Sequence, residues 1–207
     1  MPAAAAAGIR RIVWTSSTVV YGPASDYATT HVDEGAPCAP TTIYGLTKQM
    51  AEALSAFHAR RHGIEIAGLR LPLVLGPGLW YQGAASALVE VFDAAREGRR
   101  ARVAFHRHPI DLMHVADVAD AVLAALAHAG PLQGAYNLKS FEATIDQLLD
   151  DVGRSVPAAE IHLERVEPAL LFPLIDGSHF AAETGFAPRF DRERLVRDLL
   201  SLPGSQS

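Results

Sequence analysis

Residues 40–48 read Pro40-Thr-Thr-Ile-Tyr44-Gly-Leu-Thr-Lys48 and follow a strand-like run, Ile12-Val-Trp-Thr-Ser-Ser17-Thr-Val-Val-Tyr21-Gly22. On a helix, residues i and i+4 share a face with β-carbons about 5 to 6 Å apart, so Lys48 is expected beside the Tyr44 phenol. A free tyrosine titrates near about 10, and a neighbouring cation favours its ionised form. The pair therefore predicts a phenol that exchanges protons, with Ser17 holding a substrate oxygen against it.

A Tyr-x-x-x-Lys spacing alone also fits an exposed helix face with a solvated lysine. The order of the surrounding motifs favours a functional site: an apolar strand, Thr-Ser-Ser, Val-Tyr-Gly, Asp33-Glu34, Pro40, the Tyr44/Lys48 pair and Glu52. In this order the motifs resemble the extended short-chain dehydrogenase/reductase group, the NAD-dependent epimerase/dehydratase family. The resemblance continues through residues 69–78, 111–119, 134–138, 176 and 184–188, and so spans almost the whole chain.

The resemblance implies an α/β fold: a partial Rossmann-like, doubly wound parallel sheet, later strands only, with a small C-terminal substrate-binding α/β portion. Family members carry a phosphate-binding Gly-x-x-Gly-x-x-Gly turn roughly a hundred residues before the serine. Here Ile12 follows an Ala-rich start, Ala3 to Ala7 with Gly8, that predicts the end of a helix with a glycine C-cap. We therefore expect the dinucleotide-binding part to be missing, through natural truncation, a misassigned start or complementation by a partner.

Alternating apolar segments predict strands joined by helical crossovers. Strands are expected at residues 12–15, 64–71, 102–105, 136–139 and 161–166, and helices at residues 42–62, 84–97, 117–128, 144–152 and 192–200. Pro72 is expected to end regular pairing. Residues 1–75, interleaved with 110–140, are expected to form the catalytic half of a Rossmann-like domain, and residues 76–109 with 141–207 the substrate-binding portion.

The resemblance also implies the chemistry, which is hydride exchange between a substrate carbon and the nicotinamide of NAD or NADP, with Tyr44 as acid/base. Lys48 then supports the ionised phenol and bonds the nicotinamide ribose, and Ser17 orients the reacting hydroxyl or carbonyl. Ser16 and Thr18 are alternatives to Ser17, which is preferred because its offset from the Val-Tyr-Gly motif matches the family. Cofactor-binding residues are expected to be Thr15, Ser16, Tyr44, Lys48, Leu71, Pro72, Leu73 and Val74.

Substrate contacts are expected from Ser17, Thr18, Val19, Leu73, Leu79 and Arg107, and from the loop at residues 79–86. Many sugar-nucleotide members of the family carry Asn at the position of Leu73 and a diphosphate-binding Arg at that of Ile110. Loss of such a donor removes a contact worth about 1.5 to 3 kcal/mol. A nucleotide sugar and a less charged alcohol or ketone therefore both stay open, with Arg107 or Arg189 as replacement phosphate ligands.

Composition excludes several other classes of protein. The 207 residues are 49% hydrophobic and 20% charged, which indicates a globular chain and not a disordered one. A net charge of −5 offers no electrostatic basis for binding nucleic acid or a membrane, and no apolar run approaches the roughly twenty residues that cross a bilayer. The single cysteine, Cys38, excludes an intrachain disulfide and favours a cytoplasmic location. Expected partners are a small-molecule substrate and, by resemblance, a second copy in a homodimer.

Other chemistries are disfavoured. His58 and His62 have i, i+4 spacing, but no third ligand follows and neighbouring arginines repel cations, so no metal site is predicted. Residues 15–18 lack the Gly-x-Ser-x-Gly turn of serine hydrolases. His114 and Asp117, at a helix start, are expected to pack and cap rather than catalyse, and Arg70 to brace the sheet edge. The competing hypothesis is an inactive fragment that acts as a binding module or needs a partner to complete its sheet.

Overall fold

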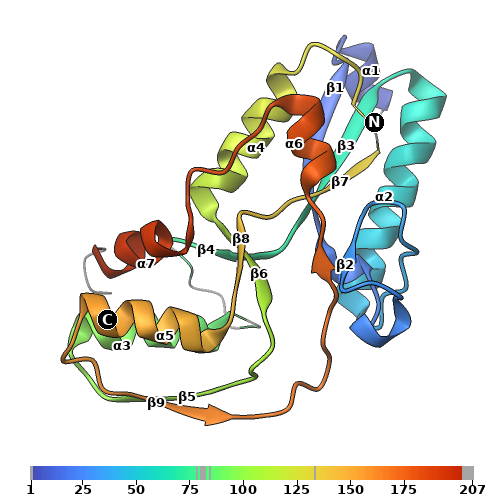
Figure 1. Cartoon of the computed structure of the whole chain (residues 1–207). Helices are drawn as coiled ribbons and strands as arrows, with labels where there is room; N and C mark the ends of the chain where they lie inside the picture. Colours follow the sequence, from blue (N-terminus) through green and yellow to red (C-terminus); the bar gives the residue numbers. More distant parts are fainter. Residues whose placement is uncertain (1, 78, 80–82, 84, 133, 202–207) are drawn as a thin grey trace. The chain divides into compact units, whose positions relative to one another are not determined.

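The computed structural model of the chain describes residues 2–77, 79, 83, 85–132 and 134–201 (Figure 1). Helices and strands alternate, and most of the strand pairs are parallel, so the expected α/β class is confirmed. The chain divides into two compact units. The first consists of Met1–Pro72, Val118–Lys139 and Leu171–Pro188, and the second of Leu73–Asp117, Ser140–Leu170 and Arg189–Ser207. Residues 171–188, placed in the substrate-binding portion from the sequence, thus pack with the first unit.

The first unit contains a parallel sheet in the order β1-β3-β7, formed by β1 (Arg11–Ser17), β3 (Glu65–Leu71) and β7 (Ala135–Asn137). The central strand β3 is buried along almost its whole length, as its apolar sequence requires. Ser17 pairs with Leu71, and Arg70 with Asn137. Because parallel strands point the same way, the carboxyl ends of all three meet at one edge of the sheet.

Helix α2 (Ile43–His62) connects β1 to β3, and Figure 1 shows it on one side of this sheet, with α4 (Val115–Ala127) and α6 (Ser178–Thr184) on the other. It begins after Thr42, whose hydroxyl accepts the Gly45 N–H at 3.0 Å, and ends at Gly63 with φ +63°. Both boundaries agree with the predicted helix, because each rests on a local cap. The Ala-rich start likewise forms α1 (Pro2–Ala6), followed by Gly8 at φ +75°.

The described residues of the second unit form short strands and helices. β4 (Leu73–Leu75) pairs in parallel with β6 (Ile110–His114), β6 pairs with β8 (Phe141–Ala143), and β5 (Ala101–Phe105) pairs with β9 (Ile161–Arg165). The helices are α3 (Ser86–Glu97), α5 (Ile145–Ser155) and α7 (Arg192–Ser201). Their apolar faces enclose a core that includes Leu75, Leu88, Val91, Leu112, Leu148 and Leu195.

Several short strands differ from the sequence-based prediction. Pro72 ends β3, but pairing resumes at the next residue, because Leu73–Leu75 find Leu112–His114 as partners. The prediction also missed β8 and the parallel pair formed by β2 (His31–Val32) and β10 (Leu174–Ile175). Strand β2 follows the 3-10 turn η2 (Ala24–Asp26) in the chain. These strands have two or three residues, and segments far apart in the chain stabilise them, which no local pattern reveals.

The start of α4 corrects a second expectation. The helix begins two residues before Asp117, and the His114 Nδ1 accepts the N–H of Ala116 at 3.1 Å. The buried Asp117 carboxylate instead accepts the N–H groups of Arg189 and Phe190 at 2.9 and 3.2 Å. The capping role expected for Asp117 is therefore wrong, because its carboxylate satisfies the backbone of a distant segment.

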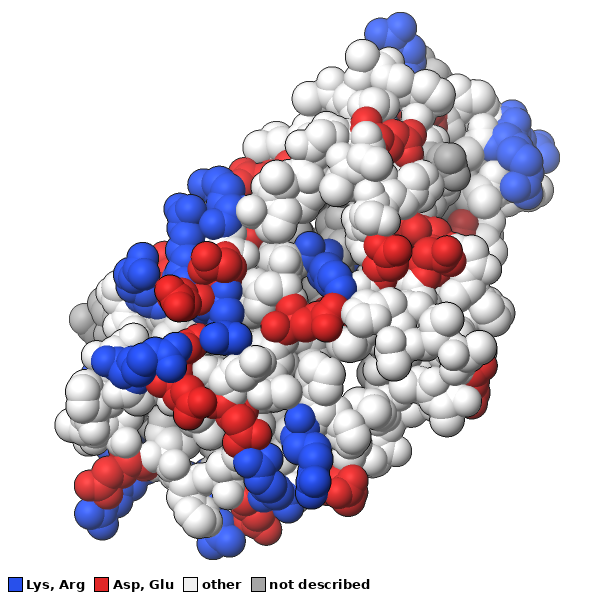
Figure 2. Space-filling model, in the orientation of Figure 1, with Lys and Arg blue, Asp and Glu red and all other residues white. Residues whose placement is uncertain are grey.

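The basic segment at residues 96–102 is balanced by carboxylates of the second unit. Arg96 pairs with Asp93, Arg99 bonds Glu90 at 2.9 Å, and Arg102 lies 3.1 Å from Glu164. On the face drawn in Figure 2, basic and acidic side chains are interspersed. Among the described helices, none is long and apolar enough to cross a bilayer.

Candidate active site

The carboxyl end of β1 places Ser17 at the edge of the sheet. Its extended backbone makes it the N-cap of a 3-10 turn, η1 (Thr18–Val20), and its Oγ accepts the Val19 N–H at 3.4 Å. Ser17 is 9% exposed. A serine hydroxyl has one proton and two lone pairs, so the bond from Val19 occupies a lone pair and leaves the hydroxyl able to donate to a substrate oxygen.

Lys48 lies against both the end of β1 and the phenol ring of Tyr44. Its Nζ donates to the Thr15 carbonyl oxygen at 2.8 Å and lies 5.6 Å from the centroids of the Tyr44 and Trp14 rings. Tyr44 is 56% exposed. An ammonium group has three donors, and the Thr15 carbonyl uses one of them. The arrangement combines an accessible phenol with an adjacent cation that keeps donors for a ligand.

Gly45 brings the first turn of α2 into contact with η1. A β-carbon at Gly45 would lie 2.2 Å from the Val19 carbonyl oxygen and 2.9 Å from the Pro40 β-carbon. Only glycine permits this approach, which holds the neighbouring Tyr44 beside the segment that follows Ser17. Gly45 was not among the residues predicted for the site, although a glycine in the first turn of a helix is an unfavourable choice and was the available signal.

A buried ion pair lies beneath this surface. Arg70 in β3 donates through Nε and Nη2 to the two carboxylate oxygens of Glu52 in α2, at 2.9 and 2.8 Å. The Ser16 hydroxyl donates to Glu52 Oε1 at 2.6 Å. Ser16 is 2% exposed, so its hydroxyl is committed to the protein interior. Burial alone would lower the pKa of Arg70, but Glu52 outweighs that effect and raises it, so the guanidinium stays charged.

The same arginine links to the other strand ends. Arg70 Nη1 donates to the Tyr21 hydroxyl at 2.7 Å, and that hydroxyl lies 2.9 Å from Asn137 Oδ1 at the end of β7. Asn137 Nδ2 donates to the Val32 carbonyl at 3.1 Å. Burial raises the pKa of Tyr21 to about 12, so this phenol stays protonated and serves as a donor. The network braces the sheet edge, which is the role predicted for Arg70.

Cys38 is the remaining partner of Arg70. Its Sγ accepts from Arg70 Nη2 at 3.3 Å. Burial raises the pKa of the thiol above its ordinary value, although the Arg70 charge opposes this. A thiol held in this protonated state is a poor nucleophile, so Cys38 is a packing residue of this network.

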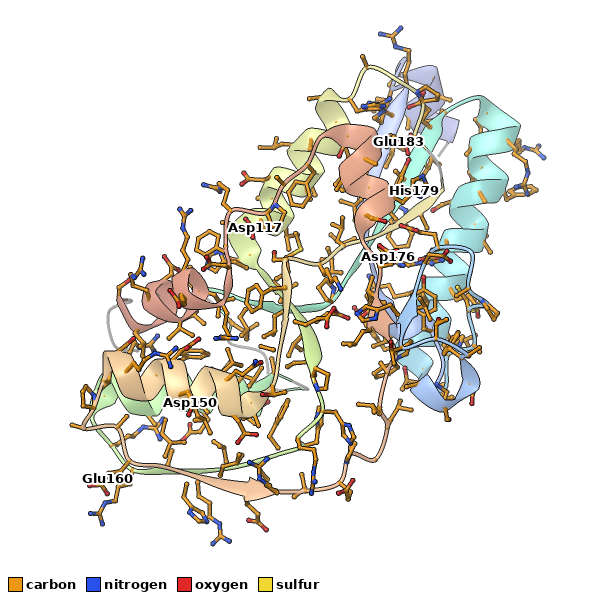
Figure 3. The ribbon with its side chains drawn as sticks, in the orientation of Figure 1. Asp117, Asp150, Glu160, Asp176, His179 and Glu183 are labelled. Atoms are coloured by element: carbon orange, nitrogen blue, oxygen red, sulfur yellow. The ribbon has the colours of Figure 1, made fainter. Side chains whose placement is uncertain are left out.

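A second polar cluster fixes α6 to β7 and is labelled in part in Figure 3. The His179 Nδ1 lies 3.6 Å from Glu34, and its Nε2 lies 3.4 Å from Glu183. The Tyr136 hydroxyl donates to Glu183 at 2.8 Å, and Glu34 accepts the Asn137 N–H at 2.7 Å. Within the described part of the chain, no three His, Cys, Asp or Glu side chains are arranged to hold a metal ion.

The other predicted site residues are divided between the units. Leu71 ends β3 and pairs with Ser17, and Pro72 follows directly after the strand. The second unit contains Leu73 and Val74 in β4, Leu79 against its core, and Arg107 in the loop after β5. Their contribution to the site stays a prediction. Of the predicted substrate loop at residues 79–86, residues 80–82 and 84 lie outside the described residues.

The residues around Lys48 fit the nicotinamide-ribose end of a dinucleotide, because a cation with unused donors and an exposed phenol meet at the carboxyl edge of a parallel sheet. Binding of the pyrophosphate needs a glycine turn between a strand and a helix. The described glycines with positive φ each follow a helix instead, and they are Gly8, Gly63, Gly98 and Gly185. The described residues thus fit one end of the cofactor only.

Comparison with known proteins identifies similar sequences and folds. The model of the NAD dependent epimerase/dehydratase family matches residues 1–138. Mitochondrial L-threonine 3-dehydrogenase of Bos taurus is 27% identical over 180 residues, which cover 81% of this chain and 48% of that protein. UDP-glucose 4-epimerase of Azospirillum brasilense is 29% identical over 217 residues, covering 94% of this chain and 61% of the epimerase.

Solved structures show the same fold. The apo form of an L-threonine dehydrogenase from Cupriavidus necator superposes with a TM-score of 0.83 at 22% identity, over 96% of this chain and 74% of that one. The chain spans about half the length of the first curated relatives that it matches. Because the superposition covers 96% of the chain, it includes residues of both units.

Proposed function

Because this chain belongs to the NAD dependent epimerase/dehydratase family, we propose that it carries the proton-transfer and substrate-orienting side chains of a nicotinamide-dependent oxidoreductase or epimerase. The position of Lys48 carries the proposal: its Nζ is bonded to the strand end that bears Ser17 and lies beside the exposed Tyr44 ring. The proposed cofactor is NAD or NADP, and the proposed substrate is a small molecule.

Each of the three side chains has a separate task. When bound, a nicotinamide ring accepts or returns a hydride. Tyr44 transfers the matching proton at its phenol oxygen. Ser17 donates a hydrogen bond to the reacting oxygen and holds it near the phenol. Lys48 uses its remaining donors to hold the ribose hydroxyls.

For the substrate, we favour a small secondary alcohol or its ketone over a nucleotide sugar. Leu73 and Ile110 occupy the positions where a polar and a phosphate-binding residue would support a nucleotide sugar, and both pack on the apolar core of the second unit. The relatives include an L-threonine 3-dehydrogenase and a UDP-glucose 4-epimerase. L-threonine is therefore the first substrate to test, and UDP-glucose is the alternative.

Calorimetric titration with NADH and NADPH tests the cofactor proposal. We expect binding in the micromolar range or tighter for the protein encoded by the gene. In a separate assay with NAD⁺ or NADP⁺, an alcohol substrate should reduce the cofactor, which is followed by absorbance. Two samples are needed: the 207-residue chain and, if the reading frame continues upstream with a Gly-x-x-Gly-x-x-Gly motif, the extended protein. Failure of both to bind either dinucleotide would contradict the proposal.

One observation favours a second candidate function, a module that is completed by another polypeptide. Among the described strands, β1 pairs on one side only, with β3. The other edge of such a strand offers backbone N–H and C=O groups to a further strand. If the 207-residue chain binds no dinucleotide but does so after addition of a segment that supplies this strand, the module interpretation is supported.

We further propose that the chain forms a homodimer through the outer face of α2. Five exposed apolar residues recur there with helical spacing: Ile43, Leu46, Met50, Leu54 and Phe57. This face is opposite to the one that bears Tyr44 and Lys48, so association leaves the site accessible. Exposed apolar stripes of this kind are typical of protein interfaces.

A charge at the centre of this stripe is expected to prevent dimer formation. Leu54→Glu places a carboxylate in a desolvated contact and should weaken the dimer by at least about 100-fold. The matched control is Leu123→Glu on α4, since Leu123 is similarly exposed at 62% against 58% for Leu54. Sedimentation at several protein concentrations measures the mass of the wild type and of the two variants. Equal masses for wild type and Leu54→Glu would contradict an α2 interface.

A further inference from the structure

Glu52 lies on the same face of α2 as the two proposed catalytic residues. It follows Lys48 by four positions and Tyr44 by eight, so the three side chains share one side of the helix. Both of its carboxylate oxygens are occupied. Oε1 accepts from Ser16 at 2.6 Å and from Arg70 at 2.9 Å, and Oε2 accepts from Arg70 at 2.8 Å.

The contacts of Glu52 reach the strand ends that form the site. Ser16 lies in β1 between Thr15, whose carbonyl binds Lys48, and Ser17, the last residue of the strand. Arg70 lies in β3, directly beside Ser16 in the parallel register. One carboxylate therefore joins the helix that bears Tyr44 and Lys48 to both strands.

Stability alone does not explain why this position holds a charge. The Glu52 and Arg70 side chains are 11% and 6% exposed, and a buried ion pair is often no more stabilising than apolar residues of the same volume. The pair instead fixes the relative orientation of the two side chains, because a guanidinium and a carboxylate joined by two parallel hydrogen bonds hold one geometry. The bond from Ser16 extends that geometry to β1.

We propose that Glu52 is a positioning residue, which sets the distance of Tyr44 and Lys48 from Ser17 by binding Ser16 and Arg70 at once. The inference rests on the proposed function of these three residues. Glu52 touches none of the reacting groups directly. It acts through the strand end: if the Ser16 bond is lost, the Thr15 carbonyl and the Ser17 hydroxyl are free to shift relative to α2.

The same two strands provide a matched control at their opposite end. Arg11 in β1 donates to Glu65 in β3 at 2.8 Å, and this pair also joins the strands through an arginine and a glutamate. It lies at the amino ends of the strands, one β-strand length from the candidate site. Loss of its charge in Glu65→Gln perturbs the sheet without reaching Tyr44, Lys48 or Ser17.

The kinetic test compares Ser16→Ala, Glu52→Gln and their double variant with Glu65→Gln. We expect Ser16→Ala and Glu52→Gln each to lower kcat by about 10- to 100-fold, with KM changed by less than about twofold, because misplacement affects the chemical step more than binding. The double variant should lose no more than the worse single variant, since both break one connection. Glu65→Gln should keep kcat within about twofold. The proposal would be overturned if the kcat losses of the two single variants multiplied in the double variant. It would also be overturned if Glu65→Gln lost as much kcat as Glu52→Gln.

A second measurement does not depend on turnover. Amide hydrogen exchange of residues 16–20 and of the first turns of α2 should become faster by about tenfold in Ser16→Ala and stay unchanged in Glu65→Gln. Ser16→Ala leaves the Glu52–Arg70 pair in place, so it keeps the test available if Glu52→Gln does not fold. Unchanged exchange in Ser16→Ala would overturn the proposal, whether or not the protein turns over.

The outcomes also separate this proposal from the function on which it rests. An inactive Tyr44→Phe together with wild-type kinetics and exchange in Ser16→Ala would remove only the positioning role of Glu52. A fully active Tyr44→Phe together with faster exchange in Ser16→Ala would remove the acid/base assignment and leave Glu52 as the residue that orders the strand end.

Discussion

Replacement of Tyr44 by phenylalanine is expected to lower kcat by about 10³-fold or more, because general acid–base transfer contributes about 10² to 10⁴ and no other phenol is proposed to take over. Affinity for the dinucleotide should stay within about twofold. The phenylalanine ring preserves the aromatic neighbour of the Lys48 ammonium, which lies 5.6 Å from the ring centroid. Steady-state kinetics and calorimetry measure the two quantities separately.

Tyr27→Phe is the matched control for this substitution. Its hydroxyl accepts the Gly22 N–H at 2.8 Å and donates to the Pro37 carbonyl at 2.9 Å, so the same chemical deletion there removes backbone contacts only. Lys48→Ala, in contrast, should weaken both turnover and cofactor affinity, because Lys48 contacts the phenol ring and is proposed to hold the ribose. Near-normal turnover of Tyr44→Phe would contradict the acid/base role.

Gly45→Ala is expected to have the second-largest effect, a loss of about 100-fold in kcat/KM. The new β-carbon would lie 2.2 Å from the Val19 carbonyl oxygen, and because this oxygen belongs to the backbone it cannot rotate away, so α2 and η1 must separate. Overpacking of this kind costs about 1 to 3 kcal/mol of stability. A displacement near 1 Å at a catalytic group lowers activity by about 10².

Gly153→Ala provides the control for helix propensity. Gly153 lies inside α5 of the second unit, and a β-carbon there meets nothing within 4 Å. This substitution should raise stability by about 0.5 to 1 kcal/mol, because alanine is the better helix former. Thermal unfolding and kinetics of both variants test the prediction. If Gly45→Ala keeps wild-type kcat/KM, close contact between α2 and η1 is not required for activity.

The elements that the sequence predicted well depend on local signals. Helix α2 begins at the Thr42 cap and ends at Gly63, and both features involve residues within four positions of the boundary. The Tyr44–Lys48 contact is of the same kind, since helix geometry alone places i and i+4 together. The strands β1 and β3 were recognisable from their apolar runs, which are typical of strands in a parallel sheet.

The missed features depend on residues far apart in the chain. Asp117 has the sequence position of a helix cap, but it binds backbone groups 72 and 73 residues away. Strand β4 follows a proline and exists because β6 pairs with it. Glu52 was recognised only as part of a motif, because its partners Ser16 and Arg70 lie 36 and 18 residues away.

The sequence by itself determined the α/β class, the long helix with Tyr44 and Lys48 on one face, and the family, because periodicity, caps and motif order are properties of neighbouring residues. Only the tertiary structure decided that the Ser16 hydroxyl of the Thr-Ser-Ser run binds Glu52, whereas the Ser17 hydroxyl accepts the Val19 N–H. It also decided that Gly45 must touch η1. The physical reason is that the burial of a side chain and its hydrogen-bond partners depend on which chain segments pack together. The sequence around one residue does not show which distant segment will pack against it.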